Sequence, residues 1–168
     1  EYNTKKIIDE IKEKYNKLDC IVNNAALQIC KPFWEMEGIE WDLIYNSNVK
    51  SIFLLSKYAL ELLKFNKGNI INIASIHSVA TSDKIAAYAS SKAAIVGLTR
   101  NLAIELSKFG IRVNCISPGA IDTKMLRDGL KRDNLDIEKM KKAHLLGDIG
   151  KPDNIAKLVT FLANNELS

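Results

Sequence analysis

Asn69-Ile-Ile-Asn-Ile-Ala74 begins the part of the sequence that decides the fold. This short β-branched run is typical of a buried strand, and residues 86–107 follow it as a long stretch with helical spacing. Gly110 ends that helix, and Ile111-Arg-Val-Asn-Cys-Ile116 predicts the next strand. Two strands joined by a helix run parallel, because the helix carries the chain back across the face of the sheet.

The same alternation continues on both sides of this unit. Apolar residues at helical spacing predict a first helix that ends by Lys17, and Asp19-Cys-Ile-Val-Asn23 predicts another strand. The stretch from Trp34 to Phe65 is predicted to be helical, and a last helix is predicted to begin at Lys151-Pro-Asp with Asp153 as its N-cap. The pattern therefore predicts an α/β fold with a doubly wound, Rossmann-like parallel sheet.

Composition limits the class of protein. The chain has 168 residues, 47% hydrophobic and 26% charged, so residues 1–168 suffice for a single domain with a buried core. The net charge of +4 is spread over 24 basic and 20 acidic side chains without a basic block, which argues against a nucleic-acid partner. No apolar run approaches the ~18 residues of a membrane span. Three cysteines without metal-ligand spacing fit a reducing compartment, so we expect a cytoplasmic protein without a metal or a membrane partner.

Small and polar residues follow each predicted strand. In open α/β sheets, ligands bind beyond the carboxyl ends of the strands, so these residues are the candidates for chemistry. They are Asn23-Asn-Ala-Ala26, Ala74-Ser75 and Ser117-Pro-Gly119.

Tyr88 and Lys92 lie four residues apart on the predicted helix and therefore share one face. A nearby ammonium favours the phenolate and lowers the pKa of a tyrosine, which then exchanges protons with an alcohol or a carbonyl oxygen. The spacing alone is weak evidence, because Tyr2 and Lys6 repeat it in an otherwise featureless segment. Ser75 strengthens the hypothesis, because it follows a strand thirteen residues before Tyr88 and can reach the same crevice.

A serine hydrolase is the less favoured interpretation of the same region. Ser75, His77 and Asp83 lie too close in sequence to occupy the separate loops that such triads use. The chain also has no G-x-S-x-G nucleophile elbow.

Several motifs together resemble the short-chain dehydrogenase/reductase family, in its order and spacing and across nearly the whole chain. They are Val22-Asn-Asn-Ala-Ala26, Asn48-Val-Lys-Ser51, Ile71-Asn-Ile-Ala-Ser75, Tyr88-Ala-Ser-Ser-Lys92, Arg112-Val-Asn-Cys-Ile-Ser-Pro-Gly-Ala-Ile-Asp-Thr123 and Gly150-Lys-Pro-Asp-Asn-Ile-Ala156.

The resemblance implies an NAD- or NADP-dependent oxidoreductase that interconverts a secondary alcohol and a ketone. Tyr88 would be the general acid/base, and Lys92 would lower its pKa and hold the nicotinamide ribose. Ser75 would bind the substrate oxygen, and Asn48 would fix a water that relays protons from Lys92. The implied cofactor-binding residues are Asn24, Ala25, Ala26, Tyr88, Lys92, Pro118, Gly119, Ile121 and Thr123.

The resemblance also indicates where a substrate would lie. Ser75 and Tyr88 would contact it, and the positions of His77 and Gln28 resemble 3-hydroxybutyrate dehydrogenases, where they help to bind a carboxylate. Lys84 sits one residue away from the lysine expected there, so sugar and polyol dehydrogenases fit equally well. The charged, weakly periodic residues 122–146 would form a mobile substrate lid.

The resemblance is incomplete at both ends. No glycine-rich phosphate-binding turn is present, so we expect that turn and the first strands before Glu1 and a final strand after Ser168. Ala26 replaces the usual glycine, which would crowd the site if that position needed a positive φ. Trp34 and Trp41 are expected in the core.

Family members are commonly dimers or tetramers built on two long helices, so a homo-oligomer is expected. The alternative to an enzyme is an inactive fragment of this fold that serves as an interaction or structural module. Such a module would have no mechanistic use for Asn48, Ser75, Tyr88 and Lys92 together.

Overall fold

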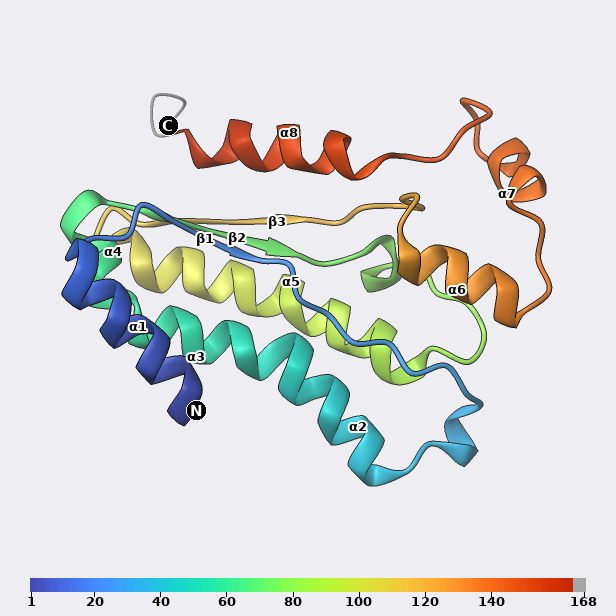
Figure 1. Cartoon of the computed structure of the whole chain (residues 1–168), viewed down its shortest axis with the longest axis horizontal. Helices are drawn as coiled ribbons and strands as arrows, with labels where there is room; N and C mark the ends of the chain where they lie inside the picture. The colour runs from blue at the N-terminus through green and yellow to red at the C-terminus, as the bar shows by residue number, and fades with distance from the viewer. Residues whose placement is uncertain (165–168) are drawn as a thin grey trace. The chain divides into compact units, whose positions relative to one another are not determined.

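The computed structural model describes residues 1–164, which belong to two compact units (Figure 1). The first unit is Glu1–Ser117, and the second begins at Pro118. Each unit is described by itself.

A parallel sheet forms the centre of the first unit. Its strands are β1 (Cys20–Asn23), β2 (Asn69–Ile73) and β3 (Arg112–Ile116), in the order β1-β2-β3. Each strand pairs in parallel with its neighbour, so the predicted strand direction is confirmed. The register aligns Asn23 with Asn72 and Asn72 with Cys115, which brings the three carboxyl ends to one edge of the sheet.

Helices cover one face of this sheet. Figure 1 shows α1 (Tyr2–Tyr15), α3 (Ser51–Tyr58) and α5 (Ala86–Ser107) on the same side of the strands. The apolar spacing in these helices places side chains against β-branched residues of the strands, and burial of each such side chain contributes about 1.5–3 kcal/mol. The main core cluster consists of Ile8, Ile21, Ala59, Leu62, Leu63, Ile70, Leu106, Ile111 and Val113.

The predicted helical stretch from Trp34 to Phe65 is broken into several pieces. After the 3₁₀ turn η1 (Phe33–Glu35) come α2 (Gly38–Tyr45), the π-helical turn η2 (Asn46–Lys50), α3 and α4 (Leu60–Asn66). The Glu40 side chain caps α2 by accepting a hydrogen bond from the Glu37 backbone N–H at 2.9 Å. A π-helical turn inside an α-helix frequently marks a functional position, and Asn48 occupies the centre of this one.

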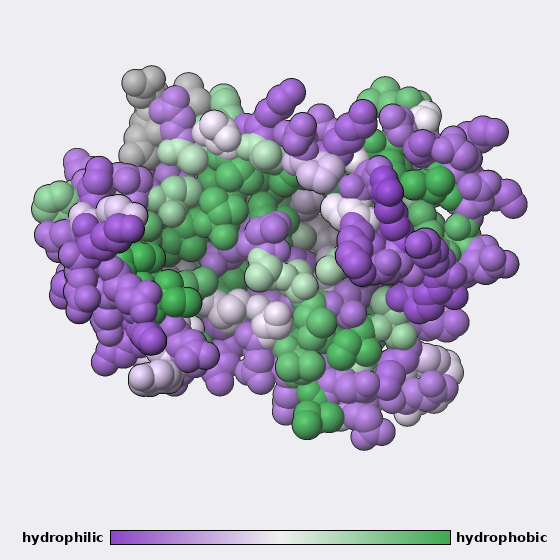
Figure 2. Space-filling view, viewed as in Figure 1, coloured by the Kyte–Doolittle hydropathy of each residue, from purple (hydrophilic) through white to green (hydrophobic). Residues whose placement is uncertain are grey.

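The expectation that Trp34 and Trp41 pack in the core is wrong. Trp34 is 73% exposed, and Trp41 stacks on Tyr45 one turn further along α2 with ring centroids 5.2 Å apart. Trp34 lies in η1, which has no buried residue, and Ile44 is the one buried residue of α2, so both tryptophans face away from the core. On the face drawn in Figure 2, hydrophobic residues form patches between hydrophilic ones.

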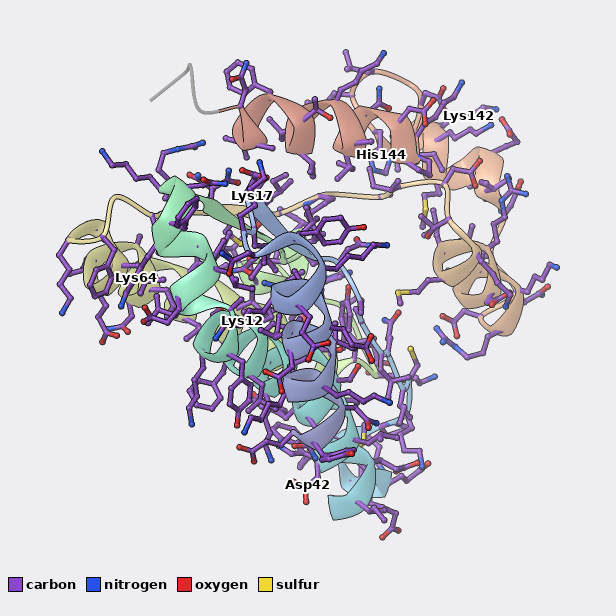
Figure 3. The ribbon with its side chains drawn as sticks, turned by 60° about the vertical axis from the view of Figure 1, so that its left-hand side comes forward. Lys12, Lys17, Asp42, Lys64, Lys142 and His144 are labelled. Carbon is purple, nitrogen blue, oxygen red and sulfur yellow. The ribbon has the colours of Figure 1, made fainter. Side chains whose placement is uncertain are left out.

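Charged side chains are scattered over the surface. Lys12 and Asp42 of the first unit and Lys142 of the second are all exposed, and their side chains project from the ribbon (Figure 3).

Within residues 1–164, no helix is both long and apolar enough to span a membrane. In the same range, no three His, Cys, Asp or Glu side chains gather in a way that could hold a metal ion.

In residues 118–164, the second unit consists of three helices and their connections. They are α6 (Lys124–Arg132), α7 (Ile137–Ala143) and α8 (Pro152–Ala163). The N-cap of α8 is Lys151 rather than the predicted Asp153, because Pro152 takes the first helical position. The Asn154 side chain completes this cap by accepting a hydrogen bond from the Lys151 N–H at 2.8 Å.

Two backbone hydrogen bonds close the base of the 122–146 insertion. Asp122 N–H donates to the Gly150 carbonyl at 2.8 Å, and Gly150 N–H donates to the Ala120 carbonyl at 2.9 Å. A Cβ atom at position 150 would collide with Ile121 Cδ1, the end of a flexible side chain, so a larger residue there would require the Ile121 side chain to move.

Candidate active site

The candidate site lies in the first unit at the carboxyl ends of β1 and β2. Because Asn23 is paired with Asn72, the loop that begins at Asn24 leaves the sheet beside the loop that carries Ser75. The N-terminal turn of α5, with Tyr88, belongs to the same region: the 3₁₀ turn η3 (Ile76–Ser78) packs against α5, and the rings of His77 and Tyr88 are 6.2 Å apart.

Ser75 and Tyr88 are brought together, as the sequence predicts. Both residues are 8% exposed, and the Ser75 hydroxyl lies close enough to the Tyr88 phenol to lower its pKa as a hydrogen-bond partner. Ser75 caps η3, where its Oγ accepts a hydrogen bond from the His77 N–H at 3.2 Å. With this acceptor position occupied, the serine hydroxyl has its proton to donate toward the phenolic oxygen.

The pKa of Tyr88 differs from the sequence expectation. Burial raises it above its ordinary value, and the hydrogen bond from Ser75 lowers it by a smaller amount. The expected lowering of this pKa by Lys92 is not found, although the Lys92 ammonium lies over the ring, 5.5 Å from its centroid. In this environment Tyr88 is a protonated phenol at neutral pH and a potential proton donor.

Lys92 is almost completely buried, with 2% of its surface exposed. Its Nζ donates a hydrogen bond to the Ile73 carbonyl at 2.8 Å, at the point where β2 ends. Burial lowers the pKa of Lys92 to about 8, because desolvation penalises the charged form. Among the described residues, this one hydrogen bond leaves two of the three N–H donors of the ammonium group for another partner.

Asn48 is 1% exposed, and its amide is fully hydrogen-bonded to protein groups. Its Oδ1 accepts a hydrogen bond from Leu27 N–H at 2.7 Å, and its Nδ2 donates to the Leu27 carbonyl at 2.9 Å. The second hydrogen of Nδ2 goes to Ser91 Oγ at 3.0 Å. The Asn48 side chain therefore fixes the loop after β1, while a water-holding role for Asn48 stays a prediction.

The loop after β1 is held at two points. Asn48 binds Leu27, and the Lys31 N–H donates to the Lys84 carbonyl at 2.9 Å. The Lys31 ammonium also binds both oxygens of Glu40, at 2.7 and 2.8 Å, and holds the pKa of that carboxyl below its ordinary value. Gln28 lies half-buried between these two points, at the carboxyl edge of the sheet.

Ala26 fits without backbone strain. The non-glycine residues with positive φ in the described part are Asn16, Lys67, Lys84 and Asn134, and Ala26 is not one of them. The glycine that is usual at this position is therefore not required by this backbone. Asn24 and Ala25 precede Ala26 as exposed residues of the same loop.

His77, a candidate for substrate binding, lies on η3 beside Tyr88 of α5. Their rings meet edge to face, and His77 Nδ1 is hydrogen-bonded to the Ala80 carbonyl at 3.2 Å. Lys84 is half exposed, and its ammonium lies 4.0 Å from Asp83. The structure thus brings His77 to the candidate site and gives Lys84 an acidic neighbour of its own.

The remaining cofactor-binding candidates belong to the second unit. Ile121 pairs with Gly150, and the Thr123 hydroxyl caps α6 by accepting a hydrogen bond from Leu126 N–H at 3.3 Å. Pro118 is half-buried, and Gly119 is exposed. Their roles in cofactor binding stay predictions.

A buried polar chain supports the site, and it confirms that Asn72, an asparagine inside a predicted strand, has a structural hydrogen-bonding role. Asn23 Nδ2 donates to Asn72 Oδ1 at 2.7 Å, and Asn72 Nδ2 donates to Thr99 Oγ1 at 2.9 Å. This chain connects β1, β2 and α5 directly behind the carboxyl edge. Its only signal in the sequence is an asparagine inside an apolar strand.

A protein-family model described as enoyl-(acyl carrier protein) reductase matches residues 1–168. The chain belongs to the short-chain dehydrogenase/reductase family. A relative in this family, the 3-oxoacyl-(acyl-carrier-protein) reductase FabG of Thermotoga maritima, is 32% identical over 98% of this chain and 66% of its own length. Cyclopentanol dehydrogenase of Comamonas testosteroni is 35% identical over 96% of this chain and 64% of its own length. The chain thus spans about two thirds of the length of these relatives.

Solved structures in the family have the same fold. The aldohexose dehydrogenase of Thermoplasma acidophilum, in ligand-free form, matches with a TM-score of 0.92 at 28% identity, over 97% of this chain and 67% of its own. The structure described as ElxO with NADP bound matches with a TM-score of 0.87 at 29% identity, over 96% of this chain and 66% of its own. The predicted Rossmann-like fold is confirmed.

Proposed function

We propose that this chain carries the catalytic part of an NAD(P)-dependent oxidoreductase that interconverts a secondary alcohol and a ketone, with Tyr88 as general acid/base. One observation carries the proposal. Ser75, Tyr88 and Lys92 form a buried cluster at the carboxyl edge of a parallel sheet, where ligands bind in this class of fold.

The residues present fit a nicotinamide dinucleotide. The two unused N–H donors of Lys92 suit the hydroxyl groups of a ribose, and Ala25 and Ala26 leave room near the backbone. The ElxO structures have NADP or NADPH bound, which supports the same cofactor class here. When bound, the nicotinamide supplies or accepts the hydride.

The chain's own residues manage the proton. In ketone reduction, Ser75 donates a hydrogen bond to the carbonyl oxygen and orients it beside the Tyr88 phenol. The phenol then donates its proton to the oxygen, on which negative charge develops as the adjacent carbon is reduced. Lys92, whose ammonium lies 5.5 Å from the centroid of the Tyr88 ring, is proposed to hold the dinucleotide beside the phenol. Alcohol oxidation runs the same steps in reverse, with the phenolate as base.

The substrate is a small molecule, and His77 and Gln28 are proposed to contact it. The relatives differ in substrate, as the names cyclopentanol dehydrogenase and aldohexose dehydrogenase state, so a hydroxy acid, a sugar, a polyol or another alcohol remains open. Residues 122–146, with their closed base at Asp122 and Gly150, are proposed as the substrate lid.

The decisive experiment compares two tyrosines in the full-length protein that contains this chain. Tyr88→Phe should lower nicotinamide-dependent turnover by roughly 10²–10⁴-fold, the usual contribution of a positioned general acid or base. Tyr2→Phe removes an exposed hydroxyl that also lies four residues before a lysine, and turnover should not change. Full activity of Tyr88→Phe would refute the catalytic assignment.

The same assay tests the alternative of an inactive module. Wild-type protein without turnover on hydroxy acids, polyols, sugars and cyclic alcohols, with either dinucleotide, would favour that alternative.

We also propose a cytoplasmic homo-oligomer, a dimer or tetramer. The exposed Phe53 on α3 and Ile104 on α5 support the oligomer, and light scattering measures its size. No disulfide joins the cysteines of residues 1–164, which supports the location.

A further inference from the structure

Ser91 lies on α5 between Tyr88 and Lys92 and is completely buried. Its hydroxyl donates a hydrogen bond to the Tyr88 backbone carbonyl at 2.7 Å. It also accepts a hydrogen bond from Asn48 Nδ2 at 3.0 Å. Ser91 thus connects the backbone of Tyr88 to the π-helical turn η2.

This connection continues beyond Asn48. The Asn48 amide binds both the N–H and the carbonyl of Leu27, so an unbroken series of hydrogen bonds runs from Leu27 through Asn48 and Ser91 to Tyr88. Asn48 and Ser91 are both shielded from water, where hydrogen bonds are stronger and an unmade bond costs more. The loop after β1 and the first turn of α5 therefore hold each other in place.

Ser91 acts on the part of α5 that carries the reacting groups. A serine that bonds to a carbonyl one turn earlier bends its helix slightly, and here the bonded carbonyl belongs to Tyr88 itself. The other end of the series holds the loop that contains Ala25, Ala26 and Gln28. A change at Ser91 therefore alters the placement of the phenol relative to that loop.

We infer that Ser91 is a positioning residue that sets Tyr88 against the loop after β1 through Asn48. The inference rests on the proposed function, because the loop and the phenol need a fixed geometry only if both face the same reactants. Ser91 touches no reactant itself.

Ser91→Ala in the full-length protein tests the inference. A misplacement of about 1 Å costs up to ~10²-fold in rate, so we expect kcat to fall on the order of tenfold. KM for the dinucleotide should change by less than about twofold, because the groups that bind it remain. A general loss of folding would instead lower the active fraction and the melting temperature without a change in kcat per folded molecule.

Ser90→Ala is the matched control. Ser90 is the neighbouring serine on the same helix, and its hydroxyl makes the same kind of bond, to the Ala87 carbonyl at 3.1 Å. No hydrogen bond to Asn48 is found for Ser90 in the described part of the chain. We expect Ser90→Ala to keep kcat within about twofold of wild type, because it removes a bond of the same kind and leaves the series through Asn48 intact.

A double-mutant cycle with Asn48→Ala tests the route. If Ser91 acts through Asn48, the double variant should lose no more than about twofold beyond Asn48→Ala alone, because both changes break the same link. If the kcat losses of the two single variants instead multiply in the double variant, the inference is overturned. If Ser91→Ala does not fold, Ser91→Cys replaces it, and its weak S–H donor should give a partial loss of kcat. Wild-type kcat in Ser91→Cys would overturn the inference.

The two proposals fail in different ways. Full turnover of Tyr88→Phe removes the proposed function. Loss of turnover in Tyr88→Phe, together with equal kcat values for Ser91→Ala and Ser90→Ala, removes only the positioning role of Ser91.

Discussion

Two tyrosine–lysine pairs of identical spacing lie in very different surroundings. On α1, Tyr2 is 80% exposed, and Lys6 faces Glu10 at 4.0 Å on the surface. On α5, Tyr88 and Lys92 are buried beside the end of β2, with Ser75 and the Ile73 carbonyl as partners. Pairs of the same spacing thus differ in burial and in their neighbours, so the spacing alone does not mark a candidate site.

The largest expected difference between the pairs concerns the two lysines. Lys92→Met should lower kcat/KM by about 10²-fold or more, because the dinucleotide loses two N–H donors that would hold it beside the Tyr88 phenol. Lys6→Met should leave kcat/KM unchanged. Steady-state kinetics of both variants measure this, and equal activities would erase the distinction between the two pairs.

Stability against pH separates the same two lysines. The folded chain releases the proton of Lys92 near pH 8, whereas its ordinary pKa is 10.5. Between these values the unfolded chain holds a proton that the folded chain has lost, so this group makes the free energy of unfolding rise with pH. Relative to Lys92→Met, wild type should gain up to about 3 kcal/mol across this window.

Urea unfolding at several pH values measures this gain. Lys6→Met is the control, since it removes an exposed lysine from the same protein. Identical pH slopes for the two variants would show that the burial of Lys92 does not affect its proton.

A smaller difference is expected between buried and exposed asparagines. Asn72→Ala leaves the buried Asn23 amide and the Thr99 hydroxyl without their shared partner, so it should cost about 1–3 kcal/mol of unfolding free energy. Asn3→Ala, on the exposed side of α1, should cost about 0.5 kcal/mol or less. Denaturant midpoints of the two variants compare these costs, and an equal cost would count against the buried chain.

The smallest expected effect is a shift of the pH profile. Ser75 lowers the pKa of Tyr88, so Ser75→Ala should move the rising limb of the oxidation rate to higher pH. Oxidation needs the phenolate, which explains the sign. The residual kcat of Ser75→Ala is measured against pH, and a shift to lower pH would contradict the hydrogen-bond argument.

Much of the fold could be predicted because the strands and α5 are marked locally. β-branched runs, Gly110 and helical spacing suffice for β2, α5 and β3, and the parallel direction follows from their alternation. The interruption of the 34–65 stretch could not be predicted, because Asn48 satisfies its amide against Leu27, which is distant in sequence. The exposure of Trp34 likewise depends on tertiary structure, since it lies in η1, a turn without a buried residue.

For the site, the residue types and their order came from the sequence alone. Ser75, Tyr88 and Lys92 were predicted to meet because each follows a strand end or shares a helix face with the next. Only the tertiary structure decided that the pKa of Tyr88 is raised and that of Lys92 is lowered. It alone also connected Ser91 to Asn48. The physical reason is that desolvation and hydrogen-bond partners depend on which distant segments surround a group, and no local pattern records them.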